Sequence, residues 1–311
     1  KKMPLNTLIE SPLAKIKTFA VIPNPKIPLP KDIFGATRVN SAGLDLSNTE
    51  VFAELNTEIA KAAKKKWQAA PFTREVKNGK PVFDPLDLRR QVGVVEQATP
   101  DDVKKAVKNA TDAFPQWDAR DVSERADILR KASVLLEKHR AELMYLAVRE
   151  GGRTLPNVLS EIREAVDFCR YYAFHAENHL ADIVLPGYTG ETNILRTHGR
   201  GIFLCVSPWN FPVAIFTGQV AAALVSGNAV IAKPARQTPL TAALIVKLFH
   251  EAGVAKEVLQ LMPGRGDIVG AELVTNPVVH GVLLTGSNAT ARSIQQSLAD
   301  REGPIVPLVA E

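Results

Sequence analysis

The sequence predicts an α/β fold in which a parallel sheet is covered by helices on both faces. Short apolar runs alternate with longer amphipathic runs through residues 201–311, which is the order strand, helix, strand. Residues of unusual chemistry follow each short run, at the edge where parallel sheets hold their ligands. The chain has 311 residues, of which 46% are hydrophobic, so it can bury a large core in one or two domains.

The predicted elements of this region follow a regular order. Strands are expected at 201–206, 229–232, 258–262, 279–284 and 305–309, and helices at 213–226, 238–252, 267–275 and 288–300. Because a helix joins each strand to the next, the strands are expected to run parallel and to end at one edge.

The first part of the chain is expected to be extended. Six prolines, at positions 4, 12, 23, 25, 28 and 30, indicate an arm or linker over residues 1–52. A helix is then expected over 53–69, followed by a short hairpin that turns at Asn78-Gly79.

Helices are expected to dominate the next hundred residues. Thr99 is placed to cap a helix over 100–113, with Pro100 in its first position and acids in its first turn. Helical spacing continues to residue 150, where a glycine-rich break over 150–156 precedes a helix that holds residues 161–172. Residues 183–199, with Pro186-Gly187 between apolar runs, indicate a second hairpin.

Five groups of residues lie at the predicted carboxyl ends of the strands. They are Pro208-Trp209-Asn210, Lys233-Pro234-Ala235, Gly264-Arg265-Gly266, Thr285-Gly286-Ser287 and Glu311. Each has an ordinary interpretation: a turn-forming asparagine, a solvated lysine, turn glycines or a serine N-cap. The set of glycines at 264, 266 and 270 is one residue longer than the usual dinucleotide fingerprint and is weak evidence by itself.

The order of these motifs is more specific than any one of them. PWNFP, KPA followed by QTP, PGRGDIVG, TGS and LVAE occur in the order that resembles the cofactor-binding half of the NAD(P)-dependent aldehyde dehydrogenase superfamily. The resemblance implies a Rossmann-like sheet and an NAD site.

Two further segments narrow the resemblance. Residues 29–46 resemble the connector of bifunctional proline-utilisation proteins, and REAVDFCRYYA at 163–173 resembles a helix of their L-glutamate γ-semialdehyde dehydrogenase part. We therefore expect an arm at 1–52, the first part of the NAD-binding domain at 53–182, an oligomerisation hairpin at 183–199 and the Rossmann-like core at 200–311. The catalytic domain is expected beyond Glu311.

The resemblance also implies roles for single residues. Asn210 would stabilise an oxyanion and Glu311 would activate the deacylating water. Lys233 would bind the adenosine ribose, and Gly286 with Ser287 would bind the pyrophosphate at a helix N-terminus. The remaining residues expected at the cofactor are Val206, Ser207, Pro208, Trp209, Arg236, Gly266, Gly270 and Thr285. Arg236 replaces the glutamate of the usual KPAEQTP pattern, so NADP is a possible cofactor beside NAD.

Composition argues against several other classes of protein. The net charge of +5 is diffuse, and Lys64-Lys65-Lys66 is more typical of a solvated helix face than of a nucleic-acid contact. Two cysteines indicate a reducing compartment, and neither a signal peptide nor a membrane helix is evident, so we expect a cytoplasmic protein. Cys169 and Cys205 lie in apolar surroundings and are expected to be buried and inert, and no metal site is expected.

The function that the resemblance implies is NAD-dependent oxidation of L-glutamate γ-semialdehyde, formed from pyrroline-5-carboxylate, to glutamate. This chain would be the cofactor-binding portion, inactive alone and assembled into a homo-oligomer through the 183–199 hairpin. FAD would serve only a proline dehydrogenase part outside this chain. The alternatives are an aldehyde dehydrogenase of another substrate, or an inactive nucleotide-binding or interaction module.

Overall fold

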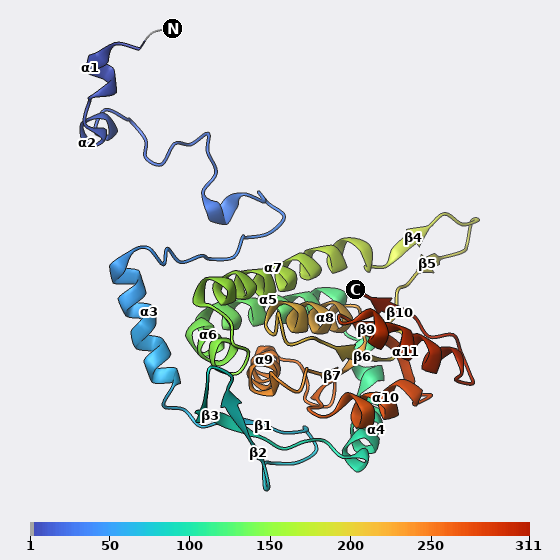
Figure 1. The fold of residues 1–311 in the computed structure, drawn as a ribbon. Coiled ribbons are helices and arrows are strands. Elements are labelled where there is room, and N and C mark those ends of the chain that lie inside the picture. The colour runs from blue at the N-terminus through green and yellow to red at the C-terminus, as the bar shows by residue number, and fades with distance from the viewer. Residues whose placement is uncertain (1–2) are drawn as a thin grey trace. The chain divides into compact units, whose positions relative to one another are not determined.

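The computed structural model describes residues 3–311 and divides the chain at Asn40/Ser41 into two compact units (Figure 1). The first unit holds the short helices α1 Leu5–Leu8, α2 Pro12–Ile16 and η1 Pro30–Asp32, and none of these described helices contains a buried residue. The second unit starts earlier than the predicted end of the arm at residue 52. Its first residue, Ser41, donates a hydrogen bond of 2.7 Å from its hydroxyl to Asp167.

A five-stranded parallel sheet forms the centre of the second unit. Its strands are β6 Ile202–Val206, β7 Ala229–Lys233, β8 Leu259–Leu261, β9 Val279–Leu284 and β10 Leu308–Ala310. They are ordered β10-β9-β6-β7-β8, and every pairing is parallel. The predicted α/β fold is confirmed, and all five carboxyl ends lie at one edge.

Helices cover both faces of this sheet (Figure 1). The connecting helices are α8 Ala214–Val225, α9 Pro239–Ala252, the π-helix η2 Gly266–Gly270 with α10 Ala271–Thr275, and α11 Asn288–Ala299. Alternate residues of β7 face two separate cores: Val230 and Ala232 pack in one, Ala229 and Ile231 in the other. This division explains why the central strands are apolar throughout instead of alternating with polar residues.

The helix expected over 53–69 is shorter than predicted. Helix α3 spans Thr49–Ala62, and Trp67–Ala69 forms strand β1, which pairs in parallel with β3 Asp87–Val95. The Trp67 indole donates a hydrogen bond of 3.1 Å to the Ala62 carbonyl, which satisfies a free acceptor at the end of the helix.

The predicted turn at Asn78-Gly79 is wrong. The hairpin joins β2 Lys80–Asp84 to β3, and Asp84 pairs with Asp87 across the turn. The backbone N–H groups of Lys77 and Asn78 instead donate to the Glu96 carboxylate at 3.0 and 2.8 Å, so that segment forms a loop around a long-range contact.

Four helices lie between β3 and the hairpin that precedes the central sheet. They are α4 Pro100–Asp118, α5 Val122–Lys138, α6 Arg140–Arg149 and α7 Leu155–His179. The predicted cap of α4 is confirmed, because Thr99 and Asp102 form a reciprocal capping box, although the helix runs to residue 118 instead of 113.

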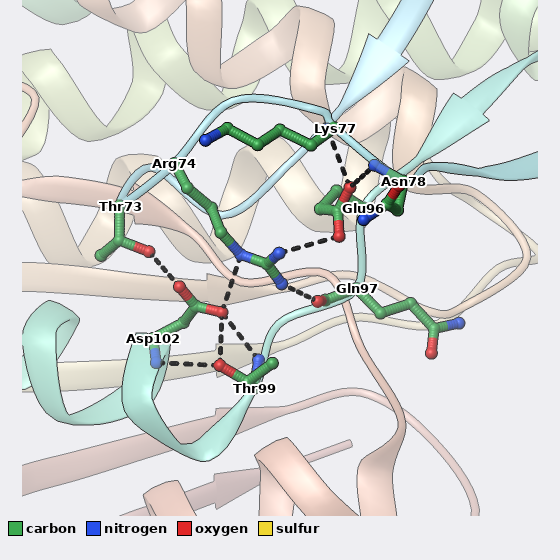
Figure 2. Close-up of polar contacts among 8 residues, drawn as sticks. All are labelled: Thr73, Arg74, Lys77, Asn78, Glu96, Gln97, Thr99 and Asp102. Atoms are coloured by element: carbon green, nitrogen blue, oxygen red, sulfur yellow. Dashed lines mark hydrogen bonds and ion pairs between the residues drawn. The ribbon is translucent and has the colours of Figure 1, made fainter.

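Arg74 fixes the loop before β2 to the start of α4 (Figure 2). Its guanidinium donates to Glu96 at 2.8 Å, to Asp102 at 3.1 Å and to the Gln97 carbonyl at 2.5 Å. Thr73 donates a further bond of 2.6 Å to Asp102. Ala98, directly after Gln97, contacts the chain that follows β8, because its N–H donates to the Pro263 carbonyl at 2.7 Å. The network therefore supports the loop that follows β8.

A two-stranded hairpin follows α7. Strands β4 Ile183–Leu185 and β5 Asn193–Leu195 pair antiparallel, as predicted for residues 183–199. Asp118 holds the returning chain, because it accepts from the Gly199 N–H at 2.5 Å and contacts His198 at 2.9 Å. Across residues 3–311, no helix combines the length and the apolar character needed to cross a membrane.

Candidate functional site

A cavity of about 670 Å³ lies at the carboxyl edge of the sheet. Five of the residues predicted to bind a cofactor line it: Val206, Lys233, Arg236, Gly266 and Gly270. The predicted residues Ser207, Pro208, Trp209, Thr285, Gly286 and Ser287 do not line it, nor do Asn210 and Glu311. The cavity has the size of a small-molecule site.

Lys233 is the charged group most enclosed at this cavity. It is the last residue of β7, its residue surface is 6% exposed, and its Nζ donates to the Pro234 carbonyl at 3.3 Å. Burial lowers the pKa of Lys233 because the ammonium is removed from water. A hydroxyl or phosphate oxygen placed here would supply hydrogen bonds that the enclosed ammonium lacks.

Gly270 leaves room for this side chain. A Cβ on Gly270 would lie 3.5 Å from Cε of Lys233, in ordinary van der Waals contact. A Cβ on Gly266 would meet no atom within 4 Å, so Gly266 faces open space. The two glycines thus form an open wall in which backbone can approach a ligand closely.

The exposed mouth of the cavity carries opposite charges. Arg265 donates to Asp267 at 3.0 and 2.5 Å. This hydrogen bond lowers the pKa of Asp267, and the nearby Arg236 lowers it further. Arg236 is exposed, so it can turn toward an anion at the mouth.

Helix α11 supplies a wall that the sequence did not indicate. Thr290, Ser293 and Ser297 line the cavity at helical spacing. Ser287 is the N-cap of α11, and its hydroxyl accepts from the Thr290 N–H at 3.2 Å. The Gly286 N–H donates to the Glu311 carbonyl at 3.0 Å. Ser287 is therefore an ordinary N-cap in this structure. An anion at this helix N-terminus would have to share these two N–H groups with their present acceptors.

Gln219 connects two strand ends and was also missed. Its side chain accepts from the Ser207 hydroxyl at 2.7 Å and donates to Thr285 Oγ1 at 3.1 Å and to the Val206 carbonyl at 3.3 Å. Gln219 lies on α8, twelve and sixty-six residues from its two side-chain partners, so no local pattern reveals it. It fixes the ends of β6 and β9 relative to each other.

The loop between β6 and α8 carries Asn210. Trp209 is 49% exposed, and Asn210 is exposed and makes no side-chain hydrogen bond with the described residues. Glu161 on α7 is buried, and its carboxylate accepts from the Val213 N–H at 3.2 Å and from Arg153 at 3.0 Å. Burial raises the pKa of Glu161, although both hydrogen bonds oppose the shift. The sequence did contain a signal for it: an acid among Val158, Ile162 and Ala165 on the buried face of α7.

Glu311 lines a second cavity, of about 230 Å³. Its N–H donates to the Leu284 carbonyl at 2.9 Å, and Phe168, Tyr172 and Gln219 line the same space. Burial raises the pKa of Glu164 on α7, and the charge of Glu311 raises it further. Asn210 does not line this cavity, so the described residues do not bring the two predicted catalytic residues into one pocket.

Both cysteines are buried and free. Burial raises the pKa of Cys169 to about 12 and also raises the pKa of Cys205, so neither forms a thiolate readily near neutral pH. Residues 3–311 contain no group of three or more His, Cys, Asp or Glu side chains that is arranged to hold a metal ion.

The chain belongs to the aldehyde dehydrogenase family, whose sequence profile it matches over residues 72–311. It is similar to the bifunctional protein PutA of Escherichia coli, with 43% identity over 322 residues that cover 99% of this chain and 23% of that protein. The chain therefore spans less than a quarter of the length of this curated relative.

Two solved structures share the fold. A structure of proline utilization A with proline bound in remote sites has a TM-score of 0.79 and 42% identity, over 93% of this chain and 26% of that one. A 1-pyrroline-5-carboxylate dehydrogenase from Thermus with bound NAD has a TM-score of 0.81 and 26% identity, over 88% and 55%.

Proposed function

We propose that this chain is the NAD-binding portion of an L-glutamate γ-semialdehyde dehydrogenase within a bifunctional proline-utilisation protein. The complete enzyme oxidises the aldehyde carbon to a carboxylate. One water is consumed, two electrons and a proton pass to NAD as hydride, and two protons are released. The similarity to PutA over 99% of the chain supports the substrate class.

The observation that carries the nucleotide role is the position of Lys233. A buried ammonium at a strand end, in a cavity of about 670 Å³, fits a ligand that offers hydroxyl and phosphate oxygens. The open glycine wall at Gly266 and Gly270 fits the same ligand. When bound, NAD would supply the hydride acceptor. Lys233 would hold the adenosine ribose, and Ser287, which caps α11 outside the lining of this cavity, would bind phosphate oxygens.

The chemistry at the aldehyde is divided between this chain and the rest of the enzyme. Asn210 is exposed on its loop, and its amide donates to the oxygen that gains negative charge. Glu311 removes a proton from the water that releases the product. The nucleophile lies outside this chain, since Cys169 and Cys205 are both buried with raised pKa values.

Two measurements test this function. A longer protein, which contains this chain and the catalytic domain expected beyond Glu311, should oxidise L-glutamate γ-semialdehyde with NAD. This chain alone should bind NAD and show no turnover. Calorimetric titration of this chain with NAD, with ADP-ribose as a second probe, tests the cavity without activity. Failure to bind either ligand would remove the nucleotide role.

Two other functions are distinguished by the same experiments. If the longer protein oxidises a short uncharged aldehyde far faster than the semialdehyde, it is a dehydrogenase of another substrate. If it binds NAD but oxidises no aldehyde, the chain is a nucleotide-binding module without catalytic activity.

The cofactor preference is proposed to be relaxed toward NADP. Arg236 lines the cavity mouth and is exposed, and a guanidinium pairs well with a 2′-phosphate. Asp267 opposes this effect, but Arg265 already donates two hydrogen bonds to it.

The hairpin is proposed to mediate homo-oligomer formation in the cytoplasm. Val184 and Tyr188 are 75% and 86% exposed, and Ile183 and Leu195 add further apolar surface. Surface of this kind is often covered by a partner. Sedimentation of the longer protein with and without Val184→Glu tests this role.

A further inference from the structure

The segment between β6 and α8 needs support from outside itself. Residues 207–213 contain no helix or strand, and α8 has no side-chain cap at its N-cap residue Val213. Asn210, in the middle of this segment, makes no side-chain hydrogen bond with the described residues. A group that donates one hydrogen bond to a developing charge must be held in place before the reaction.

Glu161 supplies the missing cap from another helix. Its residue surface is 1% exposed, and one carboxylate oxygen accepts from the Val213 N–H at 3.2 Å. An acid at a helix N-terminus is favoured by the helix dipole and satisfies a free N–H. The contact spans 52 residues of sequence, so it fixes α8 and the loop before it against α7.

Arg153 joins Glu161 to Phe211, the residue directly after Asn210. Its Nε donates to the second carboxylate oxygen at 3.0 Å, and its guanidinium carbon lies 4.8 Å from the centre of the Phe211 ring. Planar guanidinium groups stack favourably on aromatic faces. Arg153 itself is held just after the glycine break, where Gly152 has φ +66° and the Arg153 N–H donates to the Ala147 carbonyl at 3.3 Å.

The contacts therefore form a bridge from Glu161 through Arg153 to Phe211. It holds Phe211, directly after Asn210, by its side chain. It holds Val213, three residues after Asn210, by its backbone N–H. Neither Arg153 nor Glu161 lines the cavity at Lys233 or the cavity at Glu311. The two residues therefore contact the loop and do not contact a ligand in either cavity.

We propose that Arg153 and Glu161 are positioning residues that orient the loop carrying Asn210 toward the aldehyde oxygen. The catalytic consequence rests on the proposed dehydrogenase function, whereas the positioning of the loop does not. Loss of the bridge leaves the cofactor cavity intact and lets Asn210 sample orientations in which its amide donates to nothing.

The first test uses this chain without any activity. Tryptophan occurs at three positions, so a chain grown with 5-fluorotryptophan gives three fluorine resonances, and Trp209→Phe identifies the one adjacent to Asn210. Arg153→Met and Glu161→Gln should each shift or broaden the Trp209 resonance and leave those of Trp67 and Trp117 in place. Glu150→Gln is the matched control, because Glu150 is a buried acid that binds the first N–H groups of a different helix, α9.

Each outcome decides the proposal. A Trp209 resonance that stays unchanged in folded Arg153→Met overturns it. If Glu161→Gln unfolds, Arg153→Met alone decides, since it leaves the bond between Glu161 and Val213 in place. If both variants unfold, the bridge serves the whole fold and the proposal is also overturned.

The second test uses the longer protein. Arg153→Met should lower kcat for semialdehyde oxidation about tenfold to hundredfold, the scale expected when a catalytic group is displaced slightly. The Kd for NAD should stay within about twofold of the parent value, because Arg153 does not line the cavity at Lys233. Arg153→Lys should recover part of kcat. Equal losses in kcat and NAD affinity would contradict a role limited to the loop. If the parent protein has no semialdehyde activity, the proposed function fails, and the fluorine spectra still decide the positioning.

Discussion

The carboxylate of Glu150 accepts a hydrogen bond of 2.5 Å from the backbone N–H of Thr241, ninety-one residues later in the chain. A second bond of 3.0 Å comes from the Leu240 N–H. Glu150 therefore caps α9 from the end of α6, in the way that Glu161 caps α8 from α7. Two helices that pack on the five-stranded sheet thus begin on buried acids that belong to earlier helices.

The first prediction concerns the pH dependence of Glu150. Burial raises its pKa from 4.5 to about 7, so the folded chain binds this proton more tightly than the unfolded chain. The free energy of unfolding should therefore fall as the pH rises through that interval, by roughly 3 kcal/mol at most from this group. Urea unfolding of the parent and Glu150→Gln across this range measures the difference.

The control for this prediction is Glu54→Gln, which changes an exposed glutamate on α3. The difference between the parent and this control should not vary with pH. The free energy of unfolding of the parent minus that of Glu150→Gln should decrease as the pH rises. A value that stays constant or increases with pH would contradict the sign argued here.

The second prediction separates binding from stability at Lys233. Lys233→Ala should weaken NAD binding by roughly 1 to 2 kcal/mol, the scale of a hydrogen bond to a charged group. Because burial already lowers the pKa of Lys233, removing the ammonium should cost little stability. Titration with NAD and thermal melting of the same variant check both statements, and unchanged affinity would reject Lys233 as a ligand.

The third prediction is that Ser287→Ala has two effects. The hydroxyl caps α11, so its loss should cost about 1 kcal/mol of stability. If Ser287 also faces the cofactor phosphates, NAD affinity should fall by roughly another 1 to 2 kcal/mol. Ser287→Asp keeps a capping oxygen but adds a charge that repels phosphate. It should therefore restore the melting temperature and not the affinity.

The sheet and its helices could be predicted because their pattern is local. Apolar runs such as Ala229–Lys233 and the motifs after them identified the strand ends, and Lys233, Gly266 and Gly270 do line the cavity. The strand at Trp67–Ala69 was missed because it forms by pairing with β3, which lies further along the chain. No pattern in the residues around 67 indicates this pairing.

The supports of the site were missed for a similar reason. Glu150, Glu161 and Gln219 act on backbone groups or side chains of other elements, up to ninety-one residues away. Helical periodicity gives the face on which a residue lies but not the partner it meets there. An acid within an apolar face, as at Glu161, is the one indication that the sequence contained.

The fourth prediction concerns Arg236 and the choice of cofactor. Arg236→Glu should lower the affinity for NADP relative to NAD by about tenfold or more, since a carboxylate repels a 2′-phosphate and accepts bonds from ribose hydroxyls. Competitive titration of both dinucleotides on the same protein gives the ratio. Lys247→Glu makes the same change of charge at an exposed lysine of α9 that does not line the cavity, and it is the control. An unchanged ratio in Arg236→Glu would show that the guanidinium remains in solvent.

The last prediction concerns Glu311, whose backbone is held between the Leu284 carbonyl and the Gly286 N–H. These two bonds hold the Glu311 backbone at the end of β10, and the residue lines the same cavity as Tyr172 and Gln219. In the longer protein, Glu311→Gln keeps the shape and removes the base, so steady turnover should fall about 10²-fold or more, while the first hydride transfer persists. Rapid mixing with NAD and semialdehyde should then show a burst of NADH followed by a slow phase. Steady turnover equal to that of the parent would remove Glu311 from the release of product, and a lost burst would place it at an earlier step.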